Sequence, residues 1–191
     1  MILTIGHSNH PIERFVTLLQ QQRASAVADV RSTPYSRFNP QFGRERLRDA
    51  LASAGVQYVF LGEELGARSA DPACYDAAGR ISYAKLAATE LFRRGLERLQ
   101  AGMREYRVAL MCAEREPLEC HRTILVARQL ERSGIEIAHI LADGALETHA
   151  DAMHRLAASL QLTSTDLFRS PRELIEHAYD VQAARIAYVR K

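Results

Sequence analysis

The residue types best suited to covalent chemistry gather in one short segment, residues 112–122. Its reactive members are Cys112, Glu114, Cys120, His121 and Arg122. Cys112 ends an apolar run, and a helix is expected to begin at Pro117, so the positive end of that helix favours a thiolate. Because the thiolate is the nucleophilic form of cysteine, we predict Cys112 as a catalytic residue and His121 as a proton donor or acceptor. A cysteine packed in the core as a small hydrophobic residue is the alternative.

The next two positions of this segment are expected to face inward. His121 and Arg122 follow Leu118 by three and four positions, which places them on the helix face that carries apolar side chains. A buried arginine needs a partner, and Asp29, Glu114 or a bound anion can provide it. Arg122 is therefore either part of a structural ion pair or part of an anion clamp. The Cys-x5-Arg loop of cysteine phosphatases is excluded, because Leu118 holds the arginine position.

Arginine and aromatic side chains are interleaved along residues 31–48. Guanidinium groups bind phosphates and aromatic rings stack on bases, so this composition is typical of a loop that binds a nucleotide or a single strand. The residues assigned to substrate binding here are Arg31, Arg37, Asn39 and Phe42. A solvated basic loop, anchored to the core by its aromatic side chains, is the alternative.

The sequence predicts no metal site and identifies no cofactor. Cys112, Cys120, His121 and His7 can in principle supply four ligands, but the chain lacks the Cys-x2-Cys and His-x3-His pairs of common zinc sites. Three scattered cysteines do not form a disulfide framework, and a Cys112–Cys120 disulfide is expected only as part of a redox cycle.

Short apolar or β-branched runs alternate with stretches of helical periodicity, and these elements must position the reactive residues. The runs cover residues 2–5, 26–30, 56–61, 108–112 and 135–140. The alternation predicts an α/β fold with a mostly parallel β-sheet, helices on both faces and a C-terminal helical extension. Ligands bind beyond the carboxyl ends of such strands. This end of the sheet adds a catalytic candidate, His7, and the binding candidates Ser8, Asp29, Arg31, Glu114 and Cys120.

Two segments lie outside this alternation. Residues 62–82 are rich in small and polar residues, which predicts a lid, a binding loop or a disordered connection. Residues 1–150 are expected to form the α/β domain, and residues 151–191 a helical extension packed on the domain or on a partner subunit. Helix starts are predicted at residues 164–166 and at Ser170-Pro171.

Composition describes an ordinary globular chain. It has 191 residues, 47% of them hydrophobic and 25% charged, which excludes intrinsic disorder and collagen. The net charge of +2 is too small to indicate bulk nucleic-acid binding, although 23 of the 25 basic residues are arginine. No signal peptide or membrane span is predicted, so we expect a cytoplasmic protein with reduced thiols. The sequence leaves open whether the protein is a homo-oligomer.

The motifs together resemble a known family. They are Thr4-Ile-Gly-His-Ser8, Asp29-Val-Arg31 followed by Pro34, Arg37, Pro40 and Phe42, then Leu110-Met-Cys112-Ala-Glu114 and Cys120-His-Arg122. In this order they resemble the bacterial and archaeal "domain of unknown function 488" family over residues 2–145. The resemblance implies an α/β domain with these residues at one site, and it implies no particular reaction.

We therefore predict an enzyme that acts on a phosphate-bearing substrate, a nucleotide or a nucleic acid, at a Cys/His/Arg site. The first alternative is a non-catalytic nucleic-acid-binding module that uses residues 31–48. A second alternative is a rhodanese-like sulfur carrier or a metal site, suggested by the cysteine at a strand end. The expected partners are a phosphate-bearing small molecule or a nucleic acid, and no membrane.

Overall fold

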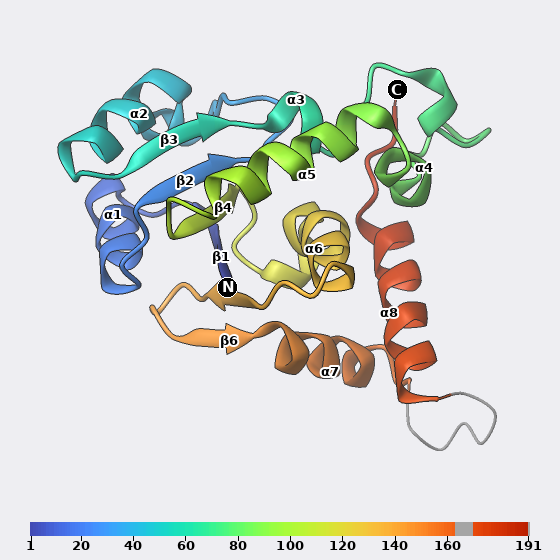
Figure 1. Ribbon diagram of the computed structural model, residues 1–191. Coiled ribbons are helices and arrows are strands. Elements are labelled where there is room, and N and C mark those ends of the chain that lie inside the picture. Colours follow the sequence, from blue (N-terminus) through green and yellow to red (C-terminus); the bar gives the residue numbers. More distant parts are fainter. Residues whose placement is uncertain (163–169, 191) are drawn as a thin grey trace.

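The computed structural model describes residues 1–162 and 170–190, and it contains one six-stranded sheet in the order β3-β2-β4-β1-β5-β6 (Figure 1). The first five of these strands run parallel, and β6 runs antiparallel to β5. The strands are β1 Ile2–Gly6, β2 Ala26–Asp29, β3 Gln57–Phe60, β4 Val108–Cys112, β5 Ile137–Ile140 and β6 Leu146–Thr148. The predicted mostly parallel sheet is confirmed.

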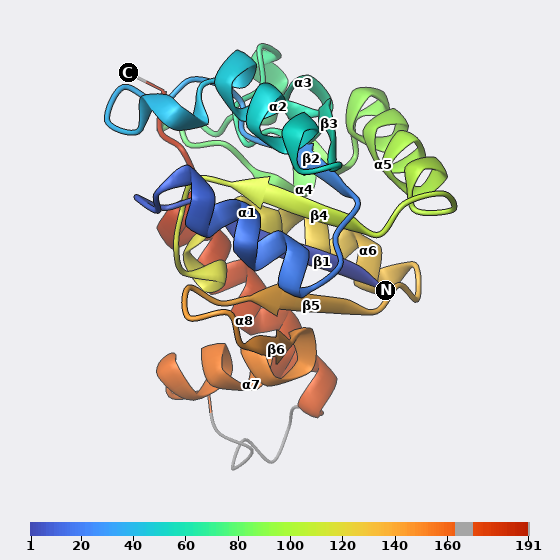
Figure 2. The same cartoon turned by 90° about the vertical axis from the view of Figure 1, so that its left-hand side faces the viewer.

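Helices cover both faces of the sheet, as predicted (Figures 1 and 2). On one face, α1 (Ile12–Gln21) and α2 (Arg44–Ser53) pack on alternate residues of the central strands, such as Leu3 and Met111. The other face is covered by α5 (Glu90–Gly102), a π-helical segment η4 (Arg122–Ala127) and α6 (Arg128–Arg132). Within the described ranges, no helix is both long enough and apolar enough to cross a membrane.

Strand β4 lies between β1 and β2, and this brings three strand ends together. Gly6 is in register with Cys112, and Asp29 is in register with Met111. The chain leaves β1 through α1 on one face, whereas it leaves β4 through η4 and α6 on the other. Neighbouring strands whose connections lie on opposite faces form the crevice where ligands bind in open α/β sheets.

The helix expected to begin at Pro117 begins later. Pro117–Glu119 forms only a 3-10 turn, whose first free N–H, that of Leu118, is capped by the Glu116 carboxylate. Cys120 is extended, with φ −134° and ψ 140°, and helical backbone follows it. Cys120 rather than Pro117 therefore precedes the helix, and it lies beside Cys112 instead of one turn inside the helix.

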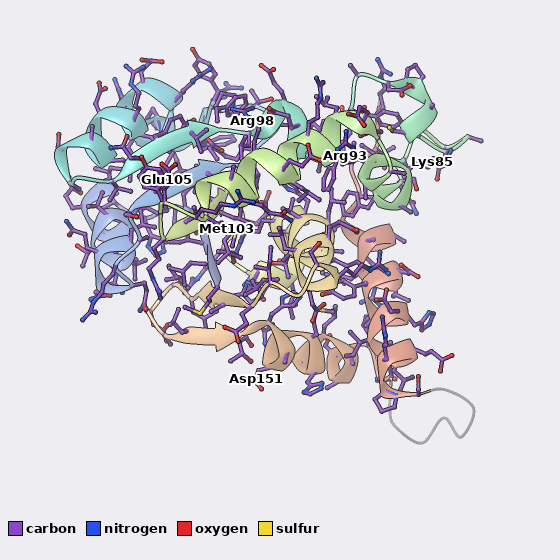
Figure 3. The ribbon with its side chains drawn as sticks, viewed as in Figure 1. Lys85, Arg93, Arg98, Met103, Glu105 and Asp151 are labelled. Carbon is purple, nitrogen blue, oxygen red and sulfur yellow. The ribbon has the colours of Figure 1, made fainter. Side chains whose placement is uncertain are left out.

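The segment 62–82 contains regular structure that the sequence did not predict. It starts with α3 (Gly62–Leu65) and includes a 3-10 turn over Pro72–Cys74, before α4 (Tyr83–Ala87). An ion pair between Glu64 and Arg98 ties α3 to α5, on which Arg98 lies (Figure 3). This part of the chain is thus fixed to the helical layer.

The C-terminal region packs on the domain through α7 (His149–Ser159) and α8 (Pro171–Ile186). Helix α8 begins as predicted at Ser170-Pro171, where Ser170 and Glu173 form a capping box. The other predicted start, at residues 164–166, lies outside the described residues. Beyond α8, the Ile81 N–H donates to the Tyr188 carbonyl and the Arg190 N–H donates to the Gly79 carbonyl, so the chain end pairs with residues 79–81.

A buried chain of hydrogen bonds joins this region to the sheet. Thr4 Oγ1 lies 2.8 Å from His139 Nδ1, His139 Nε2 lies 2.9 Å from His149 Nδ1, and His149 Nε2 lies 2.5 Å from the Tyr179 hydroxyl. The Tyr179 hydroxyl donates to Glu131 at 3.0 Å. Because the Tyr179 hydroxyl donates its proton to Glu131, its oxygen accepts from the Nε2–H of His149.

Candidate functional site

A cavity of about 510 Å³ opens at the carboxyl ends of β1, β2 and β4. The predicted residues that line it are His7, Arg31, Cys112, Glu114 and His121. All five are among the residues that the sequence analysis singled out, and the fold brings them around one cavity. The remaining lining residues are Ser32, Thr33, Tyr35, Ser36, Ala67, Arg68, Tyr83, Ala113, Glu119, Ile186 and Tyr188.

Cys112 and His121 form a contact in the wall of this cavity. Cys112 Sγ lies 3.6 Å from His121 Nδ1, and the other ring nitrogen of His121, Nε2, lies 2.9 Å from the Val30 carbonyl oxygen. A carbonyl oxygen only accepts, so Nε2 carries the proton and Nδ1 is free to accept the Cys112 proton. A thiol, a base and a group that orients the base are the parts of an activated nucleophile.

A second thiol and a carboxyl group adjoin this pair. The Cys120 thiol donates to Glu114 Oε2 at 3.0 Å. Cys112 Sγ, Cys120 Sγ and a ring nitrogen of His121 all lie within 4.8 Å of one another, and all three residues are buried. Cys120 does not line the cavity, whereas Glu114 lines it and is exposed to solvent.

The two thiols do not ionise independently. Burial raises the pKa of Cys112, and the neighbouring Cys120 and Glu114 raise it further. Burial also opposes ionisation of Cys120, but hydrogen bonding with Cys112 and the charges of Arg122 and His121 outweigh it and lower the pKa of Cys120. The pair therefore loses its first proton easily and its second with difficulty.

The other two members of the cluster respond to that charge. Burial lowers the pKa of His121, but contacts with Cys120, Glu114 and the Val30 carbonyl raise it above its usual range. Burial and the neighbouring Cys120 raise the pKa of Glu114. The ionisation states of Cys120, His121 and Glu114 are therefore coupled next to the Cys112 sulfur.

Another residue that lines the cavity, Arg31, is held by Asp29. Arg31 Nε and Nη2 donate to the two Asp29 oxygens at 2.9 and 2.7 Å, and the Tyr58 hydroxyl donates to the same carboxylate at 2.9 Å. Asp29 is fully buried and Arg31 is 5% exposed. Because Asp29 takes up Nε and Nη2, the remaining nitrogen, Nη1, is the one directed at His7, 3.3 Å from its Nε2.

His7 is a neutral acceptor in this arrangement. Its Nδ1 donates to the Ser8 carbonyl at 2.8 Å, which leaves Nε2 to accept from Arg31. Burial lowers the pKa of His7 to about 4, despite the Ser8 carbonyl, and the charge of Arg31 lowers it as well. The ring stacks on Phe42 at 4.3 Å, so Phe42 supports His7 from beneath.

The remaining predicted residues lie apart from the cavity. Arg122 is fully buried, and its Nη1 donates to the Glu114 carbonyl at 2.7 Å, so it holds the 112–122 loop from below. Ser8 has a φ of 48° and follows the cavity-lining His7. Arg37 is exposed, and the Asn39 backbone N–H donates to Ser36 Oγ at 3.0 Å.

The sequence alone did not identify two residues of the cavity wall that lie far from the reactive segment in the chain. The Arg68 guanidinium lies over the Tyr188 ring at 4.5 Å, and both residues line the cavity. The sequence predicts a lid, a binding loop or a disordered connection over residues 62–82, and this prediction is the one indication that Arg68 could line the site. No feature of the sequence indicates Tyr188, because its position depends on the packing of α8.

Comparisons with known proteins agree with the family seen in these motifs. No curated protein matches the chain at a significant level. Among solved structures, a candidate phosphatase (DUF442) from Shewanella putrefaciens CN-32 is similar with a TM-score of 0.41 and 14% identity, over 97% of this chain and 89% of that chain. A similarity of that size carries no argument about function. The family described as domain of unknown function DUF488 matches residues 11–129, and this protein belongs to it.

Proposed function

We propose that this protein is a thiol-dependent enzyme that acts on a small phosphate-bearing substrate in the cavity. The observation that carries the proposal is the contact of 3.6 Å between Cys112 Sγ and His121 Nδ1 in the cavity wall. His121 is oriented by the Val30 carbonyl, so its free nitrogen is directed at the thiol rather than at solvent.

The proposed step is nucleophilic substitution at the substrate, with the Cys112 sulfur as the attacking atom. The thiol proton moves to His121 Nδ1, and Sγ forms a bond to the electrophilic atom of the substrate. The bond from that atom to its leaving group breaks, and the leaving group takes the proton back from His121. Water then releases the second product and restores the thiol.

Two guanidinium groups favour an anionic substrate. Arg31 and Arg68 both line the cavity, and their positive charges attract a phosphate group. A volume of about 510 Å³ lies within the range of small-molecule sites. Glu114 and Glu119 also line the cavity and make part of its wall acidic. In that part of the wall, a group that donates a proton to the substrate is more useful than a group that binds an anion.

The test combines binding and turnover. Inorganic phosphate should raise the melting temperature of the wild-type protein, and Arg31→Gln should remove this effect. A panel of nucleotides and phosphate esters should yield a substrate whose turnover is lost in Cys112→Ser and kept in Cys74→Ala, since Cys74 is buried away from the cavity. Full turnover by Cys112→Ser would refute the proposed role.

A second candidate function rests on two exposed aromatic rings. Tyr35 is 79% exposed and Phe38 is 89% exposed, next to the exposed Arg37. Rings presented in this way can stack on the bases of a single strand. The buried Phe42 cannot do so. This binding function predicts affinity for short oligonucleotides that falls with salt and with Phe38→Ala, and an absence of binding at low salt would exclude it.

A further inference from the structure

We propose that Cys112, Cys120 and His121 form a binding site for Zn²⁺, with its fourth coordination position directed toward the cavity. The three residues are buried, and their ligand atoms lie within 4.8 Å of one another. They come from the end of β4 and from the two residues that precede η4, so elements of the fold rather than a local sequence pattern bring them together.

The distance between the sulfur and nitrogen atoms fits a tetrahedral site. With Zn–S near 2.3 Å and Zn–N near 2.0 Å, ligand atoms at the tetrahedral angle are separated by about 3.5 Å. Cys112 Sγ and His121 Nδ1 are 3.6 Å apart. A zinc ion can therefore bridge these two atoms without a change of side-chain position.

The surroundings of His121 are those of a metal ligand. Histidine ligands commonly donate their second N–H to a carboxylate or a backbone carbonyl, which fixes the ring and keeps the binding nitrogen unprotonated. His121 Nε2 makes this bond to the Val30 carbonyl at 2.9 Å. The nitrogen that faces Cys112 is thus the one available to a metal.

The donor set selects a thiophilic cation. Two thiolates and an imidazole suit Zn²⁺ and disfavour Mg²⁺ and Ca²⁺, which prefer oxygen ligands. Glu114 Oε2 lies 3.0 Å from Cys120 Sγ, so an oxygen ligand is within reach. Since Cys112, His121 and Glu114 line the cavity, a water or a substrate atom can complete the coordination.

Zinc binding would also regulate the enzyme, and this consequence rests on the proposed function. A sulfur bound to zinc is not free to attack a substrate, and His121 Nδ1 cannot accept a proton while it holds the metal. The zinc-loaded protein should therefore be inactive, and a chelator should restore the Cys112-dependent reaction.

The site is tested with reduced, full-length protein and ZnSO4, and metal content is measured by native mass spectrometry. We expect one Zn²⁺ per chain in the wild type and in Cys74→Ala. Cys120→Ser and His121→Gln should each weaken binding by more than about 100-fold, beyond the usual effect of residues outside the ligand set. Equal zinc content in wild type and Cys120→Ser would overturn the site.

A second measurement covers variants that fail to fold. Co²⁺ added to the wild type should give an intense thiolate-to-cobalt charge-transfer band, and absence of that band would overturn the proposal. Alkylation of Cys112 by iodoacetamide separates this result from the proposed function. If Zn²⁺ does not bind while Cys112 remains reactive and His121-dependent, the metal site is wrong and the nucleophile is retained.

Discussion

Asp29 holds Arg31 through two parallel hydrogen bonds of 2.7 and 2.9 Å, and both side chains are buried at the end of β2. The pair fixes a guanidinium in the cavity wall and directs its third nitrogen toward His7. The cavity therefore contains a preorganised cation, whose position depends on a carboxylate beneath it.

Removal of that carboxylate charge should be costly. Asp29→Asn leaves a buried guanidinium without its counter-ion and should lower the free energy of unfolding by about 3–5 kcal/mol. Asp49→Asn is the matched control, because Asp49 is 72% exposed and its ion pair with Arg48 should contribute less than about 1 kcal/mol. Urea unfolding measures both, and equal stability of the two variants would contradict the structural role of the pair.

His7 should make stability depend on pH. Its pKa is lowered from 6.5 to about 4 by burial, so the unfolded chain binds a proton between these values and the folded chain does not. Stability from this residue is present above pH 6.5 and falls as the pH is lowered toward 4, by roughly 3 kcal/mol at most. His7→Asn, which can keep a donor for the Ser8 carbonyl, should flatten this slope in urea titrations.

The titration of His139 contributes to stability in the same pH range, and its contribution must be separated from that of His7. Burial and then the charge of His149 lower the pKa of His139 to about 3, which adds a slope of the same sign. The comparison of wild type with His7→Asn removes this shared contribution. An unchanged slope in His7→Asn would show that His7 is not held neutral.

Gly6 is required by the close approach of the reactive loop. A Cβ at this position would lie 1.9 Å from the Glu114 carbonyl oxygen. Gly6→Ala should therefore displace the 112–122 loop and lower stability by about 3 kcal/mol. Gly102→Ala is the control, because a Cβ there meets no atom within 4 Å at the end of a helix. A melting temperature of Gly6→Ala equal to the wild type would contradict the close approach.

The buried histidine chain should depend on the Tyr179 hydroxyl. Tyr179→Phe leaves the His149 Nε2–H without its acceptor and should lower the free energy of unfolding by about 1–3 kcal/mol. Tyr106→Phe removes a hydroxyl from a residue that is 40% exposed and should have little effect. Thermal melts of both variants measure the difference. If Tyr179→Phe loses no more stability than Tyr106→Phe, the Tyr179 hydroxyl is not a required member of the hydrogen-bond chain.

The sequence predicted the part of the site that depends on strand order in a parallel sheet. His7, Arg31 and Cys112 follow or end buried apolar runs, and the carboxyl ends of parallel strands meet at one edge. Composition and periodicity were sufficient for this inference, as they were for helices on both faces of the sheet.

The sequence could not predict the features of the site that depend on individual side-chain contacts and on the packing of distant elements. Pro117 is a strong helix-start signal, but the Glu116 carboxylate caps only a short turn, and this places Cys120 next to Cys112. Tyr188 reaches the cavity only because α8 packs on α7 and the chain end pairs with residues 79–81. Neither contact can be predicted from the hydrophobic periodicity of the sequence.

The most direct test of the central claim is the rate at which iodoacetamide alkylates Cys112 in metal-free protein, mapped by peptide mass spectrometry. Cys112 lines the cavity, whereas the buried Cys74 and Cys120 do not, so Cys112 should react fastest of the three. His121→Gln can retain a donor for the Val30 carbonyl but removes the Nδ1 base, and it should slow this reaction about tenfold or more. A Cys112 rate that does not change in His121→Gln, or that is no faster than the rate of Cys74, would contradict the account.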